Sequence, residues 1–520
     1  MSRPHSLIHG TLLLTAASLA LRGSGMCFQI YLSNRLGAAG VGLLQLISTV
    51  GLFAMTVGTA GVRVAAMYLT AEEYGARRPG GMRKALFCCL AYGALASSAG
   101  GFVLVQAAGW ISDNWIGDAR AALSLRVLGW TMPLNCLWAV LAGYLTACSR
   151  LRQLVTVEFI DQAVSIAATA FLLVSWAGSD LEYACASIHL ANGFATAVTL
   201  LLLLRAALHG WGKTSGPAGG SMWGRLLRLC LPLAVNDALR SGLSATEQLI
   251  IPKGLQKFDG SSEGAMAAYG VIHGMVFPVL MFPVVLLASL SDLLVPELAR
   301  CRAAMDSQRI RSLSNRCLRF GLLYAAAVSG LCWCIAGPLG ELLYHNSLAG
   351  VYLRRFAPMV LILYLDAIVD GMHKGLGQQV YCVRVNTLTN LLDVTFLWLL
   401  LPRFGVAGFF FTFTFTHILN FFLSLIRLMN VAECSSPLAF AAKVLACTAG
   451  AALGVEWLLR LPLGTAAACV LGGVAFLAGF ALLVLLCGAF GPEDRRWIRM
   501  TLGIDLQKPQ REPKRCAERK

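Results

Sequence analysis

Three arginines stand inside long apolar stretches of this chain, where a charged side chain is costly. Arg22 interrupts the run from Leu7 to Leu32, and Arg63 and Arg240 lie in two later runs. An arginine at the centre of a membrane helix costs at least about 2.5–3.5 kcal/mol on insertion scales, so it is expected to face a wet cavity or a partner. Guanidinium groups bind phosphate through paired, charge-assisted hydrogen bonds. The three residues therefore predict a binding site for an anionic group, a phosphate or a diphosphate.

Each arginine also has a purely structural explanation. Arg22 could pair with a carboxylate and only hold helices together, and Arg63 lies near a possible span end, where its side chain could reach the interface. Arg240 follows Asp237 by three residues, so the two could satisfy each other on one helix face. The tripeptide Ala-Leu-Arg ends at both Arg22 and Arg240. This repetition favours a polar pathway between two related halves.

Other polar residues in the apolar runs could bind substrate or a coupling ion. Glu247 and His273 are candidate substrate contacts, although His273 could also be a helix-packing residue. Carboxylates near the arginines could neutralise an empty cavity or bind a cation. The candidates for ion coupling or gating are Asp366, Asp370, Asn386, Asn390 and Asp393.

A polar ladder marks the fifth apolar run of each half. In both ladders the residues follow an i, i+4, i+7 spacing, which places them on one helix face. Such faces could line a cavity, or they could form hydrogen bonds between helices. The ladders are Glu158, Gln162 and Ser165, with Asp161 beside them, and Asn386, Asn390 and Asp393.

The elements that must position these residues are membrane helices. The chain is 57% hydrophobic and 13% charged, whereas soluble domains carry about 25% charged residues. Apolar runs long enough to span a bilayer recur along its length, about fourteen in all. The first two are predicted at 7–32 and 41–69, and the eleventh and twelfth at 385–401 and 405–428. The predicted fold class is an all-α integral membrane protein.

The predicted organisation is two six-helix lobes in a parallel pseudo-repeat, followed by two C-terminal helices. Because each lobe holds an even number of spans, equivalent helices enter the membrane from the same side. The predicted parts are an N-lobe at 1–206, a glycine-rich linker at 207–225, a C-lobe at 226–428, two further spans within 429–488, and a basic tail at 489–520.

The basic residues predict the orientation. With the N-terminus placed inside, 30 of the 42 lysines and arginines fall in inner segments and nine in outer segments. This asymmetry follows the positive-inside rule, so both termini are predicted to be cytoplasmic. It also explains the net charge of +16 without a nucleic-acid partner.

Signatures of enzymes are missing from the sequence. It has no Walker A, HExxH, GxSxG or GxGxxG motif in the required context, and its 17 cysteines form no metal-site spacing. The outer loops are too short for a catalytic domain. We therefore expect a transporter without a cofactor, driven by the membrane potential or an ion gradient. A membrane scaffold and a glycosyl polymerase remain alternatives.

Proline predicts bent helices in the second half. Pro278 and Pro283 lie within one predicted span, and Pro296 is expected to end it. Proline removes a backbone donor, and the freed carbonyl must then be satisfied by a neighbour or by a cavity. Bent helices around a central cavity suit alternating access.

Several segments resemble the stage V sporulation protein B family, which belongs to the polysaccharide-transporter branch of the multidrug/oligosaccharidyl-lipid/polysaccharide superfamily. The middle block of the chain carries the most specific similarity, and the resemblance extends over nearly the whole length. The segments include Ala238–Pro252, Ala268–Pro283, Ser289–Glu297, Asp366–Asp393 and Leu401–Gly408.

The resemblance implies a flippase in the cytoplasmic membrane of a bacterium. It would move a lipid-linked oligosaccharide or peptidoglycan precursor across this membrane by alternating access, for spore cortex or cell-envelope polysaccharide. It implies two lobes around a V-shaped cavity and a groove for the lipid tail along the last two helices. The implied partners are an anionic lipid diphosphate substrate and membrane lipids, with cell-wall synthesis enzymes as further candidates.

Lipid II flippases of this superfamily use cavity arginines in helices 1, 2 and 8. Arg22 and Arg63 fall at comparable places, but the helix 8 neighbourhood reads His273 to Pro278 and has no arginine. Arg240 could supply this charge, or the substrate could be held differently. The alternative function within the superfamily is an ion-coupled exporter of drugs or small cations, in which Asp366 and Asp370 would dominate.

Overall fold

The structure is a computed structural model that describes residues 4–59, 61–76, 78–178, 180–209, 222–434, 438–461 and 464–488, with side chains from residue 19 onward. All regular elements in these ranges are helices, which confirms the predicted all-α class. Most of the predicted linker at 207–225 and the whole basic tail at 489–520 lie outside the described residues.

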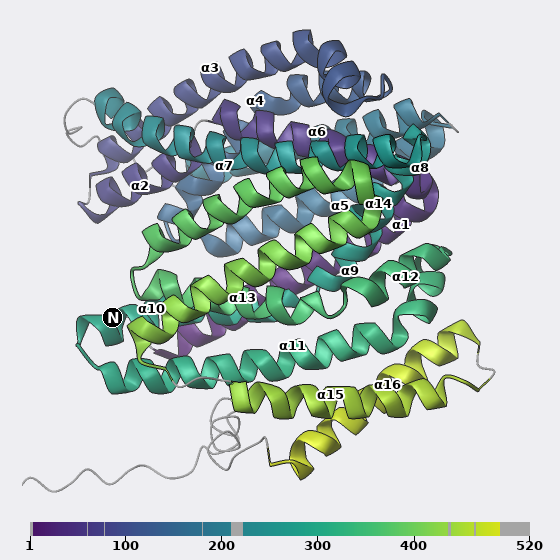
Figure 1. Cartoon of the computed structure of the whole chain (residues 1–520). Coiled ribbons are helices and arrows are strands. Elements are labelled where there is room, and N and C mark those ends of the chain that lie inside the picture. Colours follow the sequence, from purple (N-terminus) through teal and green to yellow (C-terminus); the bar gives the residue numbers. More distant parts are fainter. Residues whose placement is uncertain are drawn as a thin grey trace, which may run out of the picture.

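The helices run roughly side by side, with their axes across the molecule (Figure 1). The first half contains α1 (Pro4–Thr59), α2 (Val62–Gly75), α3 (Pro79–Ile111), the π-helix η1 (Ser112–Ile116), α4 (Ala121–Ala147), α5 (Leu151–Ser175) and α6 (Leu181–His209). The second half contains α7 (Met222–Asp259), α8 (Ser262–Tyr269), the π-helix η2 (Gly270–Val276), α9 (Phe277–Met281), α10 (Val284–Ala303), α11 (Ser307–Tyr344), α12 (Ser347–Phe356), α13 (Met359–Gly375) and α14 (Gln379–Ala432). The last two helices are α15 (Leu438–Leu458) and α16 (Thr465–Leu486).

Ten helical stretches are long and apolar enough to cross a membrane when α3 is joined with η1, and α8 with η2 and α9. The number is up to eleven if the bent pair α12–α13 forms one span. Two of them are longer than one span and contain a break. Gly37 breaks α1 at φ 71°, and Gly405 breaks α14 at φ 54°. We call the parts before and after each break the first and second arms of the helix. Glycine adopts this backbone region readily because it lacks a Cβ atom. Both breaks lie at or close to the predicted borders between spans, while the total of fourteen stays a prediction.

We call the end of the molecule that carries the loops after α2, α4, α10 and α13 the inner end, because the basic residues predict it to be cytoplasmic. The opposite end, with η1 and the start of α8, is the outer end. Figure 1 shows α15 and α16 beside α11, at the edge of the molecule farthest from α3 and α4. Both helices pack on α11.

Hydrophobic packing differs between the two ends. One continuous core joins the C-lobe to the outer halves of the N-lobe helices, through residues such as Leu43, Leu125 and Tyr269. The inner halves of the N-lobe helices form a separate core, which includes Leu69 and Leu141. The two lobes are therefore joined by packing at the outer end.

Helix α7 belongs to both cores. Its first turns contribute Met222, Leu226 and Cys230 to the inner N-lobe core, whereas Ile251 and Leu255 near its end are part of the shared outer core. This helix therefore starts in one lobe and ends in the other.

Glycines let α1 and the α8–η2 segment approach closely at the outer end. A Cβ atom on Gly42 would lie 2.3 Å from the carbonyl oxygen of Met266, and one on Gly270 would lie 1.9 Å from that of Ala38. Real side chains do not tolerate such distances, so only glycine permits this contact between the lobes.

The prolines act largely as predicted. Because residue 278 is proline, the carbonyl of Gly274 lacks its usual helical partner four residues on. The Gln29 side chain of α1 satisfies it, with Nε2 donating to the Gly274 oxygen at 3.0 Å. Pro283 coincides with the break before α10. The expectation that Pro296 ends this helix is wrong, since α10 continues to Ala303.

Candidate functional site

The three predicted arginines stand on different helices, Arg22 on α1, Arg63 on α2 and Arg240 on α7, and all three are exposed. Within the described ranges, none of them forms an ion pair with a carboxylate. Arg63 does lie close enough to Glu158 of α5 for their charges to interact. The guanidinium groups thus remain available for an anionic ligand.

Arg240 and Asp237 do not satisfy each other. In the described part of α7, Asp237 accepts a hydrogen bond from Nδ2 of its neighbour Asn236 at 3.3 Å, and no ion pair joins it to Arg240. The structure therefore does not support the explanation that Arg240 only pairs with Asp237 along the helix.

Glu247, predicted as a substrate contact, is within range of the charge of a coupling candidate. Its carboxylate on α7 is close enough to that of Asp393 on α14 for the two charges to interact. Asp393 is 5% exposed, and its Oδ1 accepts a hydrogen bond of 2.7 Å from the Thr416 hydroxyl. Two carboxylates and a hydroxyl are the oxygen ligands that hard cations prefer. The substrate role of Glu247 stays a prediction.

Asp366 and Asp370 have separate partners. Asp366 Oδ2 accepts a hydrogen bond from Asn420 Nδ2 at 3.2 Å, whereas Asp370 forms an ion pair of 2.8 Å with Lys374 one turn later. Asn420 Oδ1 in turn receives the Thr389 hydroxyl at 3.5 Å. Asp366 is thus tied to both arms of α14.

Asn386 and Asn390, the other two coupling candidates, lie on the first arm of α14 and are half-buried. Their side chains make no hydrogen bond to other described residues. Asn390 lies one turn and Asn386 two turns before Asp393, and neither side chain forms a hydrogen bond with it. Their role in coupling or gating stays a prediction.

His273 lies in an aromatic cluster. Its ring centroid is 4.5 Å from Tyr269, 5.0 Å from Phe277 and 5.7 Å from Phe409. These contacts agree with the helix-packing explanation. Its Nε2 atom is buried without a hydrogen-bond partner among the described residues, so a substrate role for His273 stays a prediction too.

The fifth-helix ladder of the N-lobe lines a cavity of about 490 Å³. Its members also bond to neighbouring helices: Gln162 Nε2 donates to the Leu21 carbonyl at 2.9 Å, and the Ser165 hydroxyl donates to Asn192. The N-lobe ladder therefore lines a cavity and also forms hydrogen bonds between helices. Residues of four helices, α1, α4, α5 and α6, line this open cavity.

Each lobe contains a matched aspartate–threonine pair that sequence reasoning missed. In the N-lobe Thr199 of α6 donates to Asp161 of α5, and in the C-lobe Thr416 donates to Asp393, both at 2.7 Å. The threonines lie on the helix or helix arm that follows the aspartate. Their signal in the sequence is weak, because threonine is common in apolar helices and its partner depends on packing.

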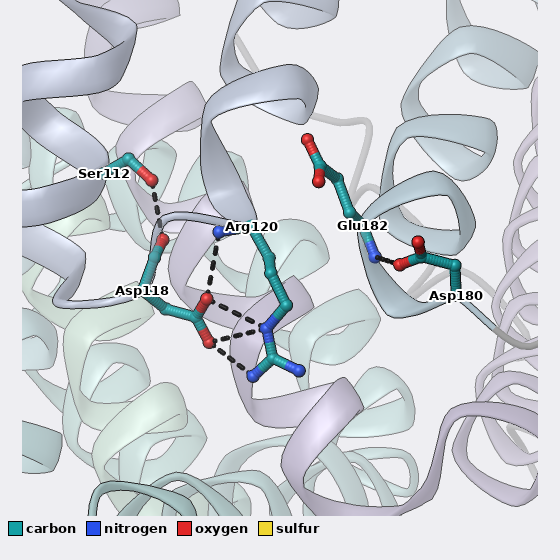
Figure 2. Close-up of polar contacts among 5 residues, drawn as sticks. All are labelled: Ser112, Asp118, Arg120, Asp180 and Glu182. Atoms are coloured by element: carbon teal, nitrogen blue, oxygen red, sulfur yellow. Dashed lines mark hydrogen bonds and ion pairs between the residues drawn. The ribbon is translucent and has the colours of Figure 1, made fainter.

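A charged crevice of about 660 Å³ lies at the outer end between the lobes. Figure 2 shows its main pair, in which the Arg120 side chain meets both carboxylate oxygens of Asp118, with Nη2 at 2.6 Å from Oδ2. Although partial burial raises the pKa of Asp118, the hydrogen bonds and charge of Arg120 outweigh it and hold the pKa below its ordinary value. Glu263 of α8 also lines the crevice, and its charge reaches Arg120 from the other lobe.

Among the described residues, no three histidine, cysteine or acidic side chains converge as a metal site. The polar groups described above are the exposed arginines, the N-lobe cavity, the C-lobe carboxylates and the charged crevice at the outer end. This arrangement suits binding and translocation of a polar solute.

Comparisons with known proteins agree with this fold. No protein-family model matches the chain. Stage V sporulation protein B of Bacillus subtilis (strain 168) is 22% identical over 415 residues, which are 78% of this chain and 80% of that protein.

Two solved structures share the arrangement of helices. The lipid II flippase MurJ in an inward closed conformation has a TM-score of 0.73 at 11% identity and covers 94% of this chain and 100% of its own. An inward-facing multidrug resistance MATE family transporter of the MOP superfamily has a TM-score of 0.64 at 13% identity, over 80% of this chain and 96% of its own. The chain is therefore a multi-pass membrane protein with the fold of these MOP-superfamily transporters, and it is similar in sequence to stage V sporulation protein B.

Proposed function

We propose that this protein is a flippase that carries a lipid-linked oligosaccharide or peptidoglycan precursor across the cytoplasmic membrane of a bacterium. The observation that carries the proposal is the match to a lipid II flippase structure over 94% of the chain. The similarity to stage V sporulation protein B supports it independently and points to spore cortex or cell-envelope polysaccharide synthesis.

The exposed arginines are the proposed binding site for the diphosphate of the substrate. Arg22, Arg63 and Arg240 have no carboxylate ion pair among the described residues, so an anionic ligand would not have to displace one. Because the guanidinium group matches phosphate oxygens in paired hydrogen bonds, three such groups suit a diphosphate. The sequence from His273 to Pro278 contains no arginine. We therefore propose Arg240 as the third arginine of the diphosphate site.

The packing supports an inward-facing resting state, if the inner end is the cytoplasmic side that the basic residues predict. The lobes share one core at the outer end, while the N-lobe has its own core at the inner end. Substrate would therefore enter from the cytoplasmic leaflet. Alternating access then requires the outer contacts of α1 with α8 and η2 to open while the inner ends of the lobes approach.

The C-lobe carboxylates are the proposed coupling site. Glu247, Asp393 and Thr416 could bind a cation, and Asp366 lies on the neighbouring α13. Moving one elementary charge through 100 mV supplies about 2.3 kcal/mol. One bound cation per cycle would therefore favour one direction of transport. Membrane lipids and enzymes of cell-wall synthesis are the proposed partners.

Proteoliposomes that hold a fluorescent polyprenyl diphosphate sugar test this function. We expect Arg22→Ala to lower the rate of translocation at least tenfold, because a charge-assisted hydrogen bond contributes about 1.5–3 kcal/mol. Arg384→Ala is the matched control, since Arg384 is also exposed on a long helix but lies near the inner end of α14. Translocation by Arg22→Ala at the wild-type rate would refute the arginine site.

The same vesicles separate the proposal from export of small cations, which the multidrug transporter fold also permits. An exporter would move a cationic dye, would lose this activity in Asp366→Asn and Asp370→Asn, and would not require Arg22. A flippase would leave the dye in place and move only the lipid.

A further inference from the structure

The polar cavity of the N-lobe has the size of a small-molecule site. Its volume of about 490 Å³ adjoins a second cavity of about 290 Å³, and Ser48, His189 and Asn192 line both. Small-molecule sites occupy about 300–1,000 Å³. We call the two cavities together the N-lobe recess. It is separate from the exposed arginines, none of which lines either cavity.

Several polar groups in the recess have no hydrogen-bond partner within the described chain. The Glu158 carboxylate and the Gln45 side-chain amide make no hydrogen bond there. His189 is 6% exposed, and its Nε2 atom is buried without a partner. Asp161 uses Oδ1 for Thr199, so its second oxygen is free. Unsatisfied polar groups are costly inside a membrane, and the recess is therefore built to hold water or a polar ligand.

The side chains of the recess narrow the class of that ligand. The recess carries two carboxylates, Glu158 and Asp161, and its described lining residues include no lysine or arginine. This lining disfavours an anionic ligand. The two carboxylates by themselves would suit a hard cation. The recess also offers imidazole, indole and amide nitrogen atoms, which a hard cation does not use. Amide groups donate and accept hydrogen bonds at once. Sugar hydroxyls do the same, so an uncharged, hydroxyl-rich group complements this lining.

We infer that the N-lobe recess binds a sugar of the substrate head group. This inference rests on the proposed flippase function and names where the carbohydrate part of the substrate goes. The place agrees with the arginine site, because Arg22 directly follows the lining residue Leu21, and Arg63 lies close to Glu158. A diphosphate at the arginines would thus leave its first sugar beside the recess, where Trp138 offers an aromatic wall.

The recess also connects to the contact between the lobes. Gln29 lines it, and the same side chain donates to the Gly274 carbonyl of η2 at 3.0 Å. A sugar hydroxyl that competes for Gln29 weakens this link between α1 and the C-lobe. Binding in the recess is therefore coupled to opening of the outer end.

Binding to the purified full chain in nanodiscs tests the inference with two probes. One is a polyprenyl diphosphate with a single N-acetylglucosamine, and the other is the same lipid without sugar. Gln45→Met removes an amide at nearly constant shape. We expect it to weaken binding of the sugar probe about three- to tenfold, the effect of one or two lost hydrogen bonds, and to leave binding of the sugar-free lipid unchanged. Gln153→Met, an exposed position of α5 outside the recess, is the control.

Three results would overturn the inference. If Gln45→Met affects both probes equally or neither, the sugar does not occupy the recess, although the flippase proposal survives. If binding of both probes depends on sodium and Glu158→Gln removes this dependence, the recess holds a cation. If the wild-type chain binds neither probe, the flippase proposal fails and the sugar site fails with it.

Discussion

At the scale of single residues, three carboxylates within the membrane helices accept hydrogen bonds from side chains of another helix or helix arm. Asp161 and Asp393 each receive a threonine hydroxyl from the following helix or helix arm, and Asp366 receives the amide of Asn420. Such bonds are worth about 0.6 kcal/mol on average in a membrane protein. Their effect is therefore to fix the orientation of each carboxylate more than to stabilise the fold.

The outer-end pair of Asp118 and Arg120 predicts a pH dependence of stability. Because Arg120 lowers the pKa of Asp118 in the folded state, the pair stabilises the fold above the ordinary aspartate pKa of about 3.9. This contribution is lost as the pH falls through the lower folded value. Since Arg120 is half exposed, we expect Asp118→Asn to cost no more than about 1 kcal/mol at pH 7.

Thermal unfolding in detergent at several pH values checks this expectation. The difference between wild type and Asp118→Asn should be largest near neutral pH and shrink below about pH 4. Asp113→Asn on η1 serves as the control, because Asp113 is exposed and has no hydrogen-bond partner among the described residues. A difference that grows on acidification would contradict the assignment.

At the scale of elements, the shape of this protein depends on where its helices are broken. Gly37 and Gly405 allow α1 and α14 each to continue as two arms, while Pro278 and Pro283 accompany the change from η2 to α9 and α10. The close contact at Gly42 and Gly270 then brings α1 against η2.

Gly270→Ala should weaken closure of the outer end. The added methyl group would overlap the Ala38 carbonyl and the Gly42 nitrogen, at 1.9 and 2.7 Å. Overpacking costs about 1–3 kcal/mol, which would shift the equilibrium between closed and open outer ends about five- to 150-fold. Spin labels at Asp180 and Ser262, two exposed positions that line the outer crevice in different lobes, should report longer distances.

The control for this substitution is Gly454→Ala in α15, where a Cβ atom meets nothing within 4 Å. It should leave the label distances unchanged. If Gly270→Ala and Gly454→Ala gave the same distances, the glycine contact would have no part in holding the outer end closed.

Much of this element scale follows from the sequence. Hydropathy predicts the helices, and the predicted span borders fall at or near Gly37 and Gly405. The i, i+4, i+7 spacing correctly places Glu158, Gln162 and Ser165 on one face, since all three line the N-lobe cavity. Periodicity reports which face of a helix is polar.

Periodicity does not report which residues of other helices contact the polar face. The partners Thr199, Thr416 and Asn420 come from later helices, and their pairing is decided by how the helices pack. The π-helical turn of η2 also escapes prediction, because the position of a single wide turn leaves no mark in hydropathy. Sequence therefore identifies the N-lobe carboxylates, but their cavity becomes visible only in three dimensions.

At the scale of the whole molecule, α7 is the helix that connects the two cores. Its inner end is fastened to α2 by Arg225, which forms an ion pair of 2.9 Å with Glu73 and a second ion pair with Glu72. Glu73 is 2% exposed, whereas Glu72 is 52% exposed. Any relative motion of the lobes must bend α7 or release this attachment.

Arg225→Gln should therefore destabilise the whole protein. It leaves the buried carboxylate of Glu73 without its cation, which costs about 1–3 kcal/mol or more. Glu72→Gln is the matched comparison and should cost less than about 1 kcal/mol, because its ion pair is solvent-exposed. Unfolding midpoints in detergent measure both variants, and equal effects would show that the attachment does not depend on the buried partner.

The wide turn of η2 has a consequence for the length of the chain. A π-helical turn accommodates one residue more than an α-helical turn would, and here it precedes Pro278, whose missing donor leaves the Gly274 carbonyl to Gln29. Deleting one residue between Gly270 and Val276 would remove this extra residue. The close contact of Gly270 with α1 and the bond of Gln29 to the carbonyl before Pro278 could then no longer keep their present spacing. The exposed loops at the outer end carry no such requirement. Insertions and deletions should therefore be tolerated in those loops and excluded from this short segment.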